Sequence, residues 1–198
     1  EYGCKANSMA IQVMGGAGYV NEHPVEMFYR DNRLNPIHEG TTGIQSIDLL
    51  GRKTQIKDGA GFKAVLSEIR SSIADAQGSE RLKGFAAQLE QACVQLTLTT
   101  ELLSAAMAEK NIDLALSNSV KYLDMFGNIV IAWTWLKLGI VAEAGLAKAA
   151  HNQDRDFYKG KLQALQYFYR FELPEIYAWA ALLSDLDDTC YAMQKEWF

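Results

Sequence analysis

The sequence predicts an all-α fold, and three observations support this prediction. Apolar residues recur at intervals of three and four along most of the chain, which is the period of an amphipathic helix. No stretch combines sustained apolar–polar alternation with the paired turn residues of a β-hairpin. Glycine- and proline-containing breaks are short, so successive helices are joined by short connections, as in an up-down antiparallel bundle.

The composition is that of a globular protein with one or two domains. The chain has 198 residues, of which 49% are hydrophobic and 22% charged. Its net charge is −5 and it contains no basic run, so we expect no nucleic-acid partner. Cys4, Cys93 and Cys190 are far apart and odd in number, which predicts neither a metal site nor a disulfide framework but reduced thiols in a cytoplasmic protein. The chain starts without Met or a signal peptide, and we expect it to be a fragment or a processed piece.

The first helical segment covers residues 1–14 and stops at Gly15-Gly16-Ala17-Gly18. A glycine-rich turn lets a backbone approach a phosphate closely, although most such turns have no ligand. Pro24 suits the first position of a short helix through Arg33. Within it, Arg30-Asp31 fits a structural ion pair and a cofactor contact equally well.

A tight turn that ends in the carboxylate of Glu39 follows. Gly40 frees the backbone directly after it. Thr41 or Thr42 can accept hydrogen bonds from the free N–H groups of the next helix. This places Glu39 at the edge of a rigid loop with a helix N-terminus behind it, which suits a side chain that reaches a ligand. A solvated glutamate or a partner of the helix dipole would occupy the same position.

The expected domain boundary lies at residues 57–61. Residues 42–56 continue as a helix that completes a first domain, residues 1–56. Residues 57–61 contain two glycines with polar neighbours, which is typical of a linker. Residues 62–198 then form a second, helical-bundle domain.

Helices of this second domain are bounded by recognisable signals. Ser79 can cap a helix from Glu80 to about Lys110, and Asp154 can cap another. The expected helices run from Phe62 to the Gly78-Ser79 break, from Glu80 to about Lys110, from Asn111 or Asp113 toward His151, from Phe157 to about Leu173, and from Pro174 to about Met193.

A membrane span is the alternative for Ile129–Leu136, which is almost wholly apolar. The uncharged run is shorter than the roughly 20 residues that a bilayer requires. Lys137 and Glu143 interrupt any extension, so we expect a buried helix of the bundle and no integral membrane segment.

Two motifs in residues 11–53 resemble the C-terminal signature of the acyl-CoA dehydrogenases, which are FAD enzymes. The first is Gln12-Val-Met-Gly15-Gly16-Ala-Gly18-Tyr19, similar to the family's Gln-x-x-Gly-Gly-x-Gly-Tyr. The second is Tyr29-Arg30-Asp31 followed by Ile37-His38-Glu39-Gly40-Thr41 and Ile44-Gln45, similar to its Arg-Asp segment and Glu-Gly-Thr loop. The variant looks most like the large members with an extra C-terminal helical domain, such as the methylthiopropanoyl-CoA dehydrogenases. The fold that this implies is the end of the family's C-terminal helical domain followed by an antiparallel helical bundle.

For the loop, the resemblance implies roles residue by residue. Glu39 would be the catalytic base that removes the α-proton of an acyl-CoA thioester, with hydride transfer to the flavin. Gly40 would border the substrate, Thr41 and Thr42 would contact FAD, and Gln45 would lie near the cofactor.

For the glycine-rich segment, the resemblance implies an FAD contact in trans. Gln12, Val13, Met14, Gly15 and Gly16 would touch the FAD bound mainly to a neighbouring subunit, which requires a homodimer or homotetramer. The family also implies an electron-transfer flavoprotein as electron acceptor.

Three positions depart from the common pattern of the family. His38 stands where common members have Tyr, Thr42 where they have Ser or Asn, and Gly43 where a polar residue is more usual. His38 is either a packing or hydrogen-bonding residue or a second acid/base beside Glu39.

Two rival functions remain. The chain would be a helical assembly or interaction module without dehydrogenase activity, because the family's β-barrel domain is not part of it. Alternatively it would resemble superfamily members with a basic, DNA-linked C-terminal domain, against which the acidic net charge argues. Neither motif specifies the acyl chain length.

Overall fold

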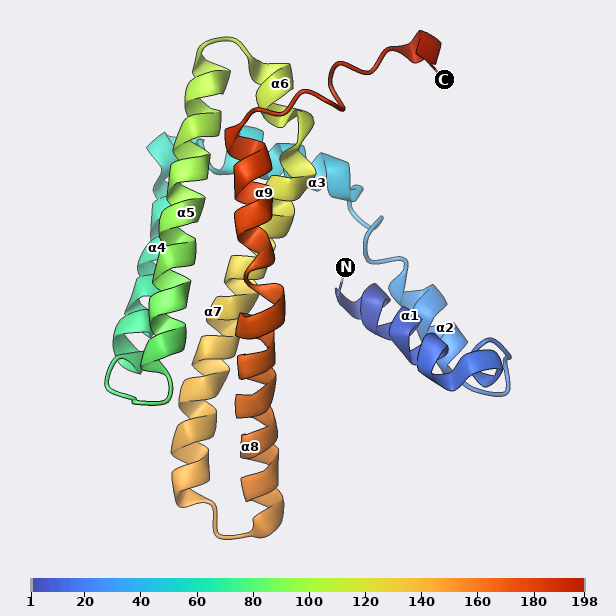
Figure 1. Ribbon diagram of the computed structural model, residues 1–198, viewed down its shortest axis with the longest axis vertical. Helices are drawn as coiled ribbons and strands as arrows, with labels where there is room; N and C mark the ends of the chain where they lie inside the picture. The colour runs from blue at the N-terminus through green and yellow to red at the C-terminus, as the bar shows by residue number, and fades with distance from the viewer. Residues whose placement is uncertain (1, 198) are drawn as a thin grey trace. The chain divides into compact units, whose positions relative to one another are not determined.

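The computed structural model describes residues 2–197, which form two compact units, one ending at Gln45 and the other beginning at Ser46 (Figure 1). None of the described residues lies in a β-strand, so the all-α prediction is confirmed. The helices are α1 (Tyr2–Met14), α2 (Val25–Asn32), α3 (Thr42–Asp48), α4 (Ile56–Ala76), α5 (Lys83–Ala108), α6 (Ile112–Ser117), α7 (Ser119–Lys148), α8 (Asn152–Tyr167) and α9 (Glu175–Ser184), with single π-helical turns at Leu49–Lys53 and Phe168–Glu172 and 3-10 turns at Gly15–Gly18 and Lys195–Trp197.

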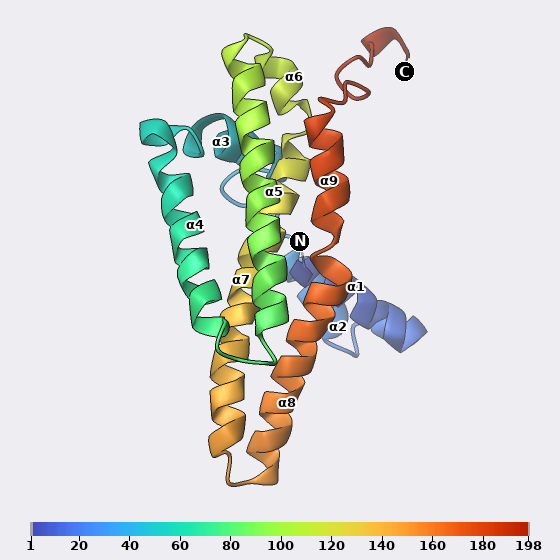
Figure 2. The ribbon, with the colours of Figure 1, turned by 60° about the vertical axis from the view of Figure 1, so that its left-hand side comes forward.

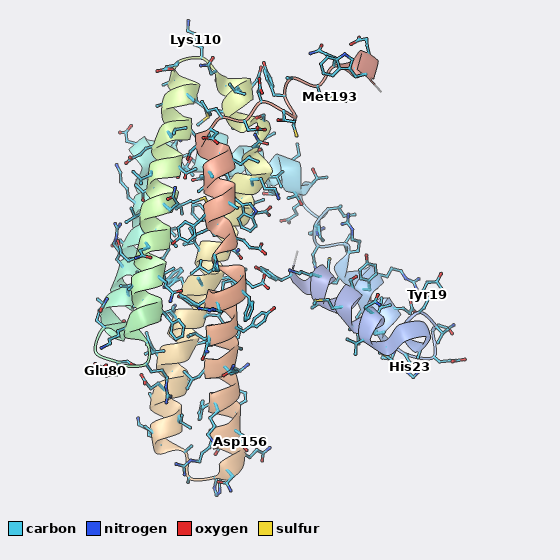
Figure 3. All side chains as sticks on the ribbon, viewed as in Figure 1. Tyr19, His23, Glu80, Lys110, Asp156 and Met193 are labelled. Carbon is cyan, nitrogen blue, oxygen red and sulfur yellow. The ribbon has the colours of Figure 1, made fainter. Side chains whose placement is uncertain are left out.

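The second unit is an up-down antiparallel bundle. Its first three members are the helices α4, α5 and α7. The fourth is formed by α8 and α9, which follow one another in the same direction (Figures 1 and 2). Glu80, in the α4–α5 turn, and Lys110, in the turn after α5, lie at opposite ends of α5 (Figure 3). The hairpin of α7 and α8 extends beyond the α4–α5 turn in both ribbon views.

The bundle core is one continuous cluster of buried apolar side chains. Tyr122 and Thr100 share a hydrogen bond of 2.7 Å between their hydroxyls, and the indole N–H of Trp133 donates to Ser72 Oγ at 2.7 Å. Among residues 2–197, every buried side-chain nitrogen and oxygen has a hydrogen-bond partner. The fully buried apolar side chains include Ile69, Leu82, Leu89, Leu96, Leu103, Met125, Ile129, Leu136, Leu165 and Ile176.

Helix α7 lies against every other long helix of the bundle, contacting α4, α5, α8 and α9. Within the described residues it is the one helix long and apolar enough to cross a membrane by length and composition alone. Its buried positions recur along the helix at Tyr122, Met125, Ile129 and Leu136. Through these positions α7 packs against the other helices as a member of the bundle.

The sequence predicted one helix from Asn111 or Asp113 toward His151, and this prediction is wrong at Asn118. The chain forms α6 and α7, separated by Asn118 with φ −106° and ψ 23°. The side-chain amide of Asn118 donates to the Asp187 carbonyl at 2.8 Å, so a partner 69 residues away holds this break.

Two further helix ends differ from the predictions. Helix α8 begins at Asn152 rather than near Phe157, with Asp154 in its first turn. Helix α9 ends at Ser184 and not near Met193. Leu186 has φ 50°, and the Asp187 carboxylate accepts hydrogen bonds from the N–H and hydroxyl of Thr189, which closes a local turn.

The proposed linker, residues 57–61, lies at the start of α4. Lys57, Asp58 and Gly59 have φ values of 50°, 54° and 76°, so the chain turns through three left-handed residues before the regular helix. Further along, Ser79 Oγ accepts a hydrogen bond from the Leu82 N–H at 3.1 Å just before α5, in the region where a capping serine was predicted.

The first unit consists of the pair α1 and α2 and the turns that follow. The side-chain amide of Asn7 donates to the Phe28 carbonyl at 3.0 Å, and the Cys4 thiol donates to the Asn32 carbonyl at 3.4 Å, so these two bonds hold the helices together. Neither helix buries a residue fully. Large apolar side chains remain exposed, including Met9, Val13, Phe28 and Leu34.

Candidate active-site loop and cofactor-binding segment

Glu39 ends the turn between α2 and α3 in an unusual backbone conformation. Its φ is 56°, in the left-handed region that non-glycine residues rarely adopt. The side-chain amide of Gln45 donates to the Glu39 carbonyl at 2.5 Å, and the Gln45 N–H donates to the Thr41 carbonyl at 3.0 Å. The first turn of α3 therefore fixes the loop, while the Glu39 side chain remains 83% exposed.

The backbone conformation at position 40 requires a glycine. Its φ is 108°, and a Cβ there would lie 3.1 Å from Gln45 Nε2. Any side chain at this position would strain the backbone and press on the amide that holds Glu39. The backbone of residue 40 therefore packs closely against the first turn of α3.

His38 lies beside the carboxylate. Its Nε2 is 3.9 Å from Glu39 Oε1, and its side chain is 67% exposed. The two groups form an ion pair when the imidazole is protonated. The packing and acid/base roles of His38 stay predictions.

A pocket of about 320 Å³ adjoins the loop. Thr41 and Thr42, both predicted cofactor contacts, line it, whereas Glu39 and Gly40 do not. Cys4 and Arg33 also line the pocket, and the sequence analysis gave neither a ligand role. Since Cys4 precedes the loop by more than 30 residues, only the pairing of α1 with α2 reveals this neighbour. Its lining is Cys4, Arg33, Pro36, Ile37, Thr41, Thr42 and Gly43.

Residues Gln12–Gly16, the other predicted cofactor contacts, occupy the opposite end of α1. They are all exposed, and a Cβ at Gly15 or Gly16 would meet nothing within 4 Å. Tyr19 and His23, which follow them, mark the far end of the α1–α2 pair (Figure 3). Ten residues of α-helix separate Cys4 from Met14, a rise of about 15 Å. Within this unit, the structure therefore does not bring the two sets of predicted cofactor contacts together.

Helix α3 continues from the loop into a well-anchored segment. Ser46 is fully buried and its hydroxyl lies 2.9 Å from the hydroxyl of Ser119, the first residue of α7. Leu50 is also fully buried. The hydrogen bond that Arg52 donates to Asp48, at 2.5 Å, lowers the pKa of that carboxyl below its usual range.

Two family descriptions match the chain, one after the other. Residues 1–53 match "Acyl-CoA dehydrogenase, C-terminal domain", and residues 65–194 match "Acetyl-CoA dehydrogenase C-terminal like". The first match includes the whole loop and the glycine-rich segment.

Curated relatives share this similarity over almost the entire chain. A 3-methylmercaptopropionyl-CoA dehydrogenase of Ruegeria pomeroyi is 33% identical over 194 residues, and a broad-specificity linear acyl-CoA dehydrogenase of Mycobacterium tuberculosis is 27% identical over 194 residues. Each alignment covers 96% of this chain and 32% of the relative, so the chain spans about a third of their length. The human mitochondrial short-chain specific acyl-CoA dehydrogenase is 52% identical over 42 residues, covering 21% of this chain and 10% of that protein.

Proposed function

The chain belongs to the acyl-CoA dehydrogenase family, and from this premise we propose that Glu39 is the base that takes the α-proton from an acyl-CoA thioester. The observation that carries the proposal is the loop geometry. Glu39 presents an exposed carboxylate on a backbone that Gln45 fixes and that continues into Gly40, where φ is 108°.

The chemistry requires such an arrangement. The α-proton of a thioester is weakly acidic, so its removal needs a base held at a fixed distance from the carbon. A left-handed residue that a hydrogen bond holds in place restricts where the Glu39 carboxylate can reach. Gly40, which has no side chain, would border the substrate next to that carboxylate.

FAD, when bound, would supply the hydride acceptor. The residues of the loop and of the glycine-rich segment are chemically suited to bind FAD. Thr41 and Thr42 would offer hydroxyl groups from the pocket beside the loop, and the Gly15-Gly16 turn has open space above its backbone. Gln45 would hold the loop at the edge of the same site.

The separation along α1 supports a homodimer or a homotetramer. Met14, in the middle of Gln12–Gly16, lies about 15 Å along the helix from Cys4, so one unit would touch its own FAD through the loop and a neighbour's FAD through this segment. Val13, which is 87% exposed, would then be covered by the neighbouring subunit.

We infer the substrate class from the membership of the chain in the family. The complete protein would oxidise an acyl-CoA and pass its electrons to an electron-transfer flavoprotein in the cytoplasm. Two of the relatives that match most of this chain are named for linear acyl-CoAs and for 3-methylmercaptopropionyl-CoA, so both classes belong in the test.

The test follows flavin absorbance in the complete FAD-bound protein under anaerobic conditions, with a panel of linear acyl-CoAs and 3-methylmercaptopropionyl-CoA. We expect one class to bleach the flavin. Glu39→Gln should slow bleaching at least about 100-fold while FAD stays bound, because a positioned base contributes about 10²–10⁴-fold to the rate.

Glu80→Gln is the matched control. Glu80 is an exposed carboxylate in the α4–α5 turn, and its change should leave bleaching unaltered. Bleaching of the Glu39→Gln protein at a rate close to that of the parent would overturn the assignment of the base.

A further inference from the structure

We propose that the pocket beside the Glu39 loop binds a diphosphate group, with Arg33 as the cationic residue that contacts it. The inference rests on the proposed function, because that function brings two molecules with a diphosphate group, FAD and acyl-CoA, to this loop. It gives a role to Arg33, which lies outside both sequence motifs and takes no part in the proposed proton transfer.

The lining of the pocket favours an anion. Among the described residues that line it, Arg33 is the one charged side chain, and none is acidic. Thr41 and Thr42 contribute hydroxyl groups to the same lining, and a hydroxyl can donate a hydrogen bond to a phosphate oxygen. A chain with a net charge of −5 therefore has a local site here that attracts negative charge.

The Arg33 guanidinium is free to bind such a ligand. Arg30, three residues earlier, is paired with Glu26 at 2.7 Å, whereas the exposed side chain of Arg33 has no ion-pair or hydrogen-bond partner among residues 2–197. The backbone of Arg33 is nevertheless fixed, because its N–H donates to the Tyr29 carbonyl at 3.1 Å and closes the last turn of α2. A fixed backbone with an unpaired guanidinium suits the binding of an anion from solvent.

The size of the pocket fits one portion of a nucleotide cofactor. Its volume is about 320 Å³, at the lower end of the roughly 300–1,000 Å³ that ligand pockets occupy. FAD and coenzyme A are both larger than this, so the pocket accommodates only a part of either molecule. A guanidinium binds phosphate groups with two parallel hydrogen bonds, and the diphosphate is the phosphate group that both molecules share.

Contacts within a single unit form the pocket before any ligand binds. The Cys4 thiol donates to the Asn32 carbonyl at 3.4 Å, and Arg33 follows Asn32 directly in the chain. On the other side, the Gln45 N–H donates to the Thr41 carbonyl at 3.0 Å. The lining residues all belong to the unit that ends at Gln45. Because these contacts already order the lining, binding costs less conformational entropy.

The experiment measures affinities by calorimetry and needs no turnover. FAD is titrated into the complete protein from which FAD has been removed, and coenzyme A is titrated into the complete FAD-loaded protein. Arg33→Gln should weaken the binding of one of these molecules about 10–100-fold, because a charge-assisted hydrogen bond is lost. Arg33→Lys keeps the charge but not the planar pair of donors, so its affinity should lie between those of the parent and Arg33→Gln.

The two titrations distinguish the sources of the diphosphate. Weaker binding of FAD alone would assign the pocket to the diphosphate of FAD, and weaker binding of coenzyme A alone would assign it to that of coenzyme A. Inorganic pyrophosphate should compete with the assigned molecule in the parent and should compete at least about 10-fold less effectively in Arg33→Gln. The urea midpoint of Arg33→Gln should equal that of the parent, because the side chain is exposed and unpaired.

Arg81→Gln is the matched control. Arg81 is an exposed arginine in the α4–α5 turn, and it too has no ion pair in the described part of the chain. Its change should leave both affinities within about 2-fold of the parent.

Parent-like affinity of Arg33→Gln for both FAD and coenzyme A would overturn the assignment, and so would an equal loss of affinity in Arg81→Gln. A parent protein whose flavin no acyl-CoA bleaches would instead contradict the proposed function. The calorimetric titrations would still decide in that case whether Arg33 binds a diphosphate group.

Discussion

The side-chain amide of Gln45 donates a hydrogen bond to the backbone carbonyl of Glu39, with 2.5 Å between the nitrogen and the oxygen. This bond ties the residue proposed as the base to the first turn of the helix that follows it. It acts on the backbone and leaves the carboxylate exposed.

Replacement of Gln45 by Leu removes the donor but keeps the size of the side chain. A neutral hydrogen bond contributes about 0.5–1.5 kcal/mol, so we expect flavin reduction per bound FAD to slow about 2–10-fold. Gln88→Leu serves for comparison, because Gln88 also donates to a backbone carbonyl on an exposed helix face, that of Gly84. An equal effect of both changes would show that the Glu39 carbonyl has no special part.

Gly139 lies where α7 packs closely against Leu165 of α8 and against Leu82. A Cβ there would overlap Leu165 Cδ1 and would lie 3.2 Å from Leu82 Cδ2, and both leucines are fully buried. Gly139→Ala should therefore destabilise the bundle by about 1–3 kcal/mol.

Gly127 lies on the same helix, but a Cβ there would meet nothing within 4 Å. Gly127→Ala should stabilise α7 by about 0.5–1 kcal/mol, because alanine favours the helix. Urea unfolding followed by tryptophan fluorescence measures both variants. Two changes of the same sign and size would contradict the packing at Gly139.

Alkaline pH should weaken the bundle through a buried thiol. Burial raises the pKa of Cys93 to about 12 from an ordinary value of 9.0. Below pH 9 both the folded and the unfolded chains keep this proton. Between pH 9 and 12 the unfolded chain releases it and the folded chain does not, so the free energy of unfolding falls by about 1.4 kcal/mol per pH unit.

Burial also raises the pKa of Tyr122 and Tyr169, which steepens the fall above pH 10. Urea midpoints at pH 8.5, 9.5 and 10 separate the contributions. Cys93→Ser should flatten the curve between pH 9 and 10, because a serine hydroxyl does not titrate there. A Cys93→Ser protein with the parent's slope would exclude the thiol as the cause.

The sequence predicted most helices because their signals are local. Apolar spacing located α5 and α7, and Ser79 marked the break before α5. The break at Asn118 was missed because its partner, the Asp187 carbonyl, is distant in sequence. The end of α9 depends on the turn around Asp187, which a helical pattern does not reveal.

In the candidate site, too, the local features could be predicted from the sequence and the tertiary contacts could not. The turn at Glu39 and the need for Gly40 follow from residue types, and the structure has both. Roles toward FAD came only from the resemblance and stay predictions. The pocket wall formed by Cys4 and Arg33 depends on how α1 pairs with α2, which no local pattern encodes.

The apolar circumference of α7 has a consequence for biosynthesis. The ribosome synthesises the chain from its N-terminus, so Ser119–Lys148 emerges before α8 and α9, which pack against it. The later of these two helices ends at Ser184. During that interval the nascent helix exposes apolar side chains that the folded bundle buries. We therefore expect chaperone binding or co-translational aggregation to occur in the interval between the synthesis of α7 and that of α9. Slower translation of α8 would prolong this interval.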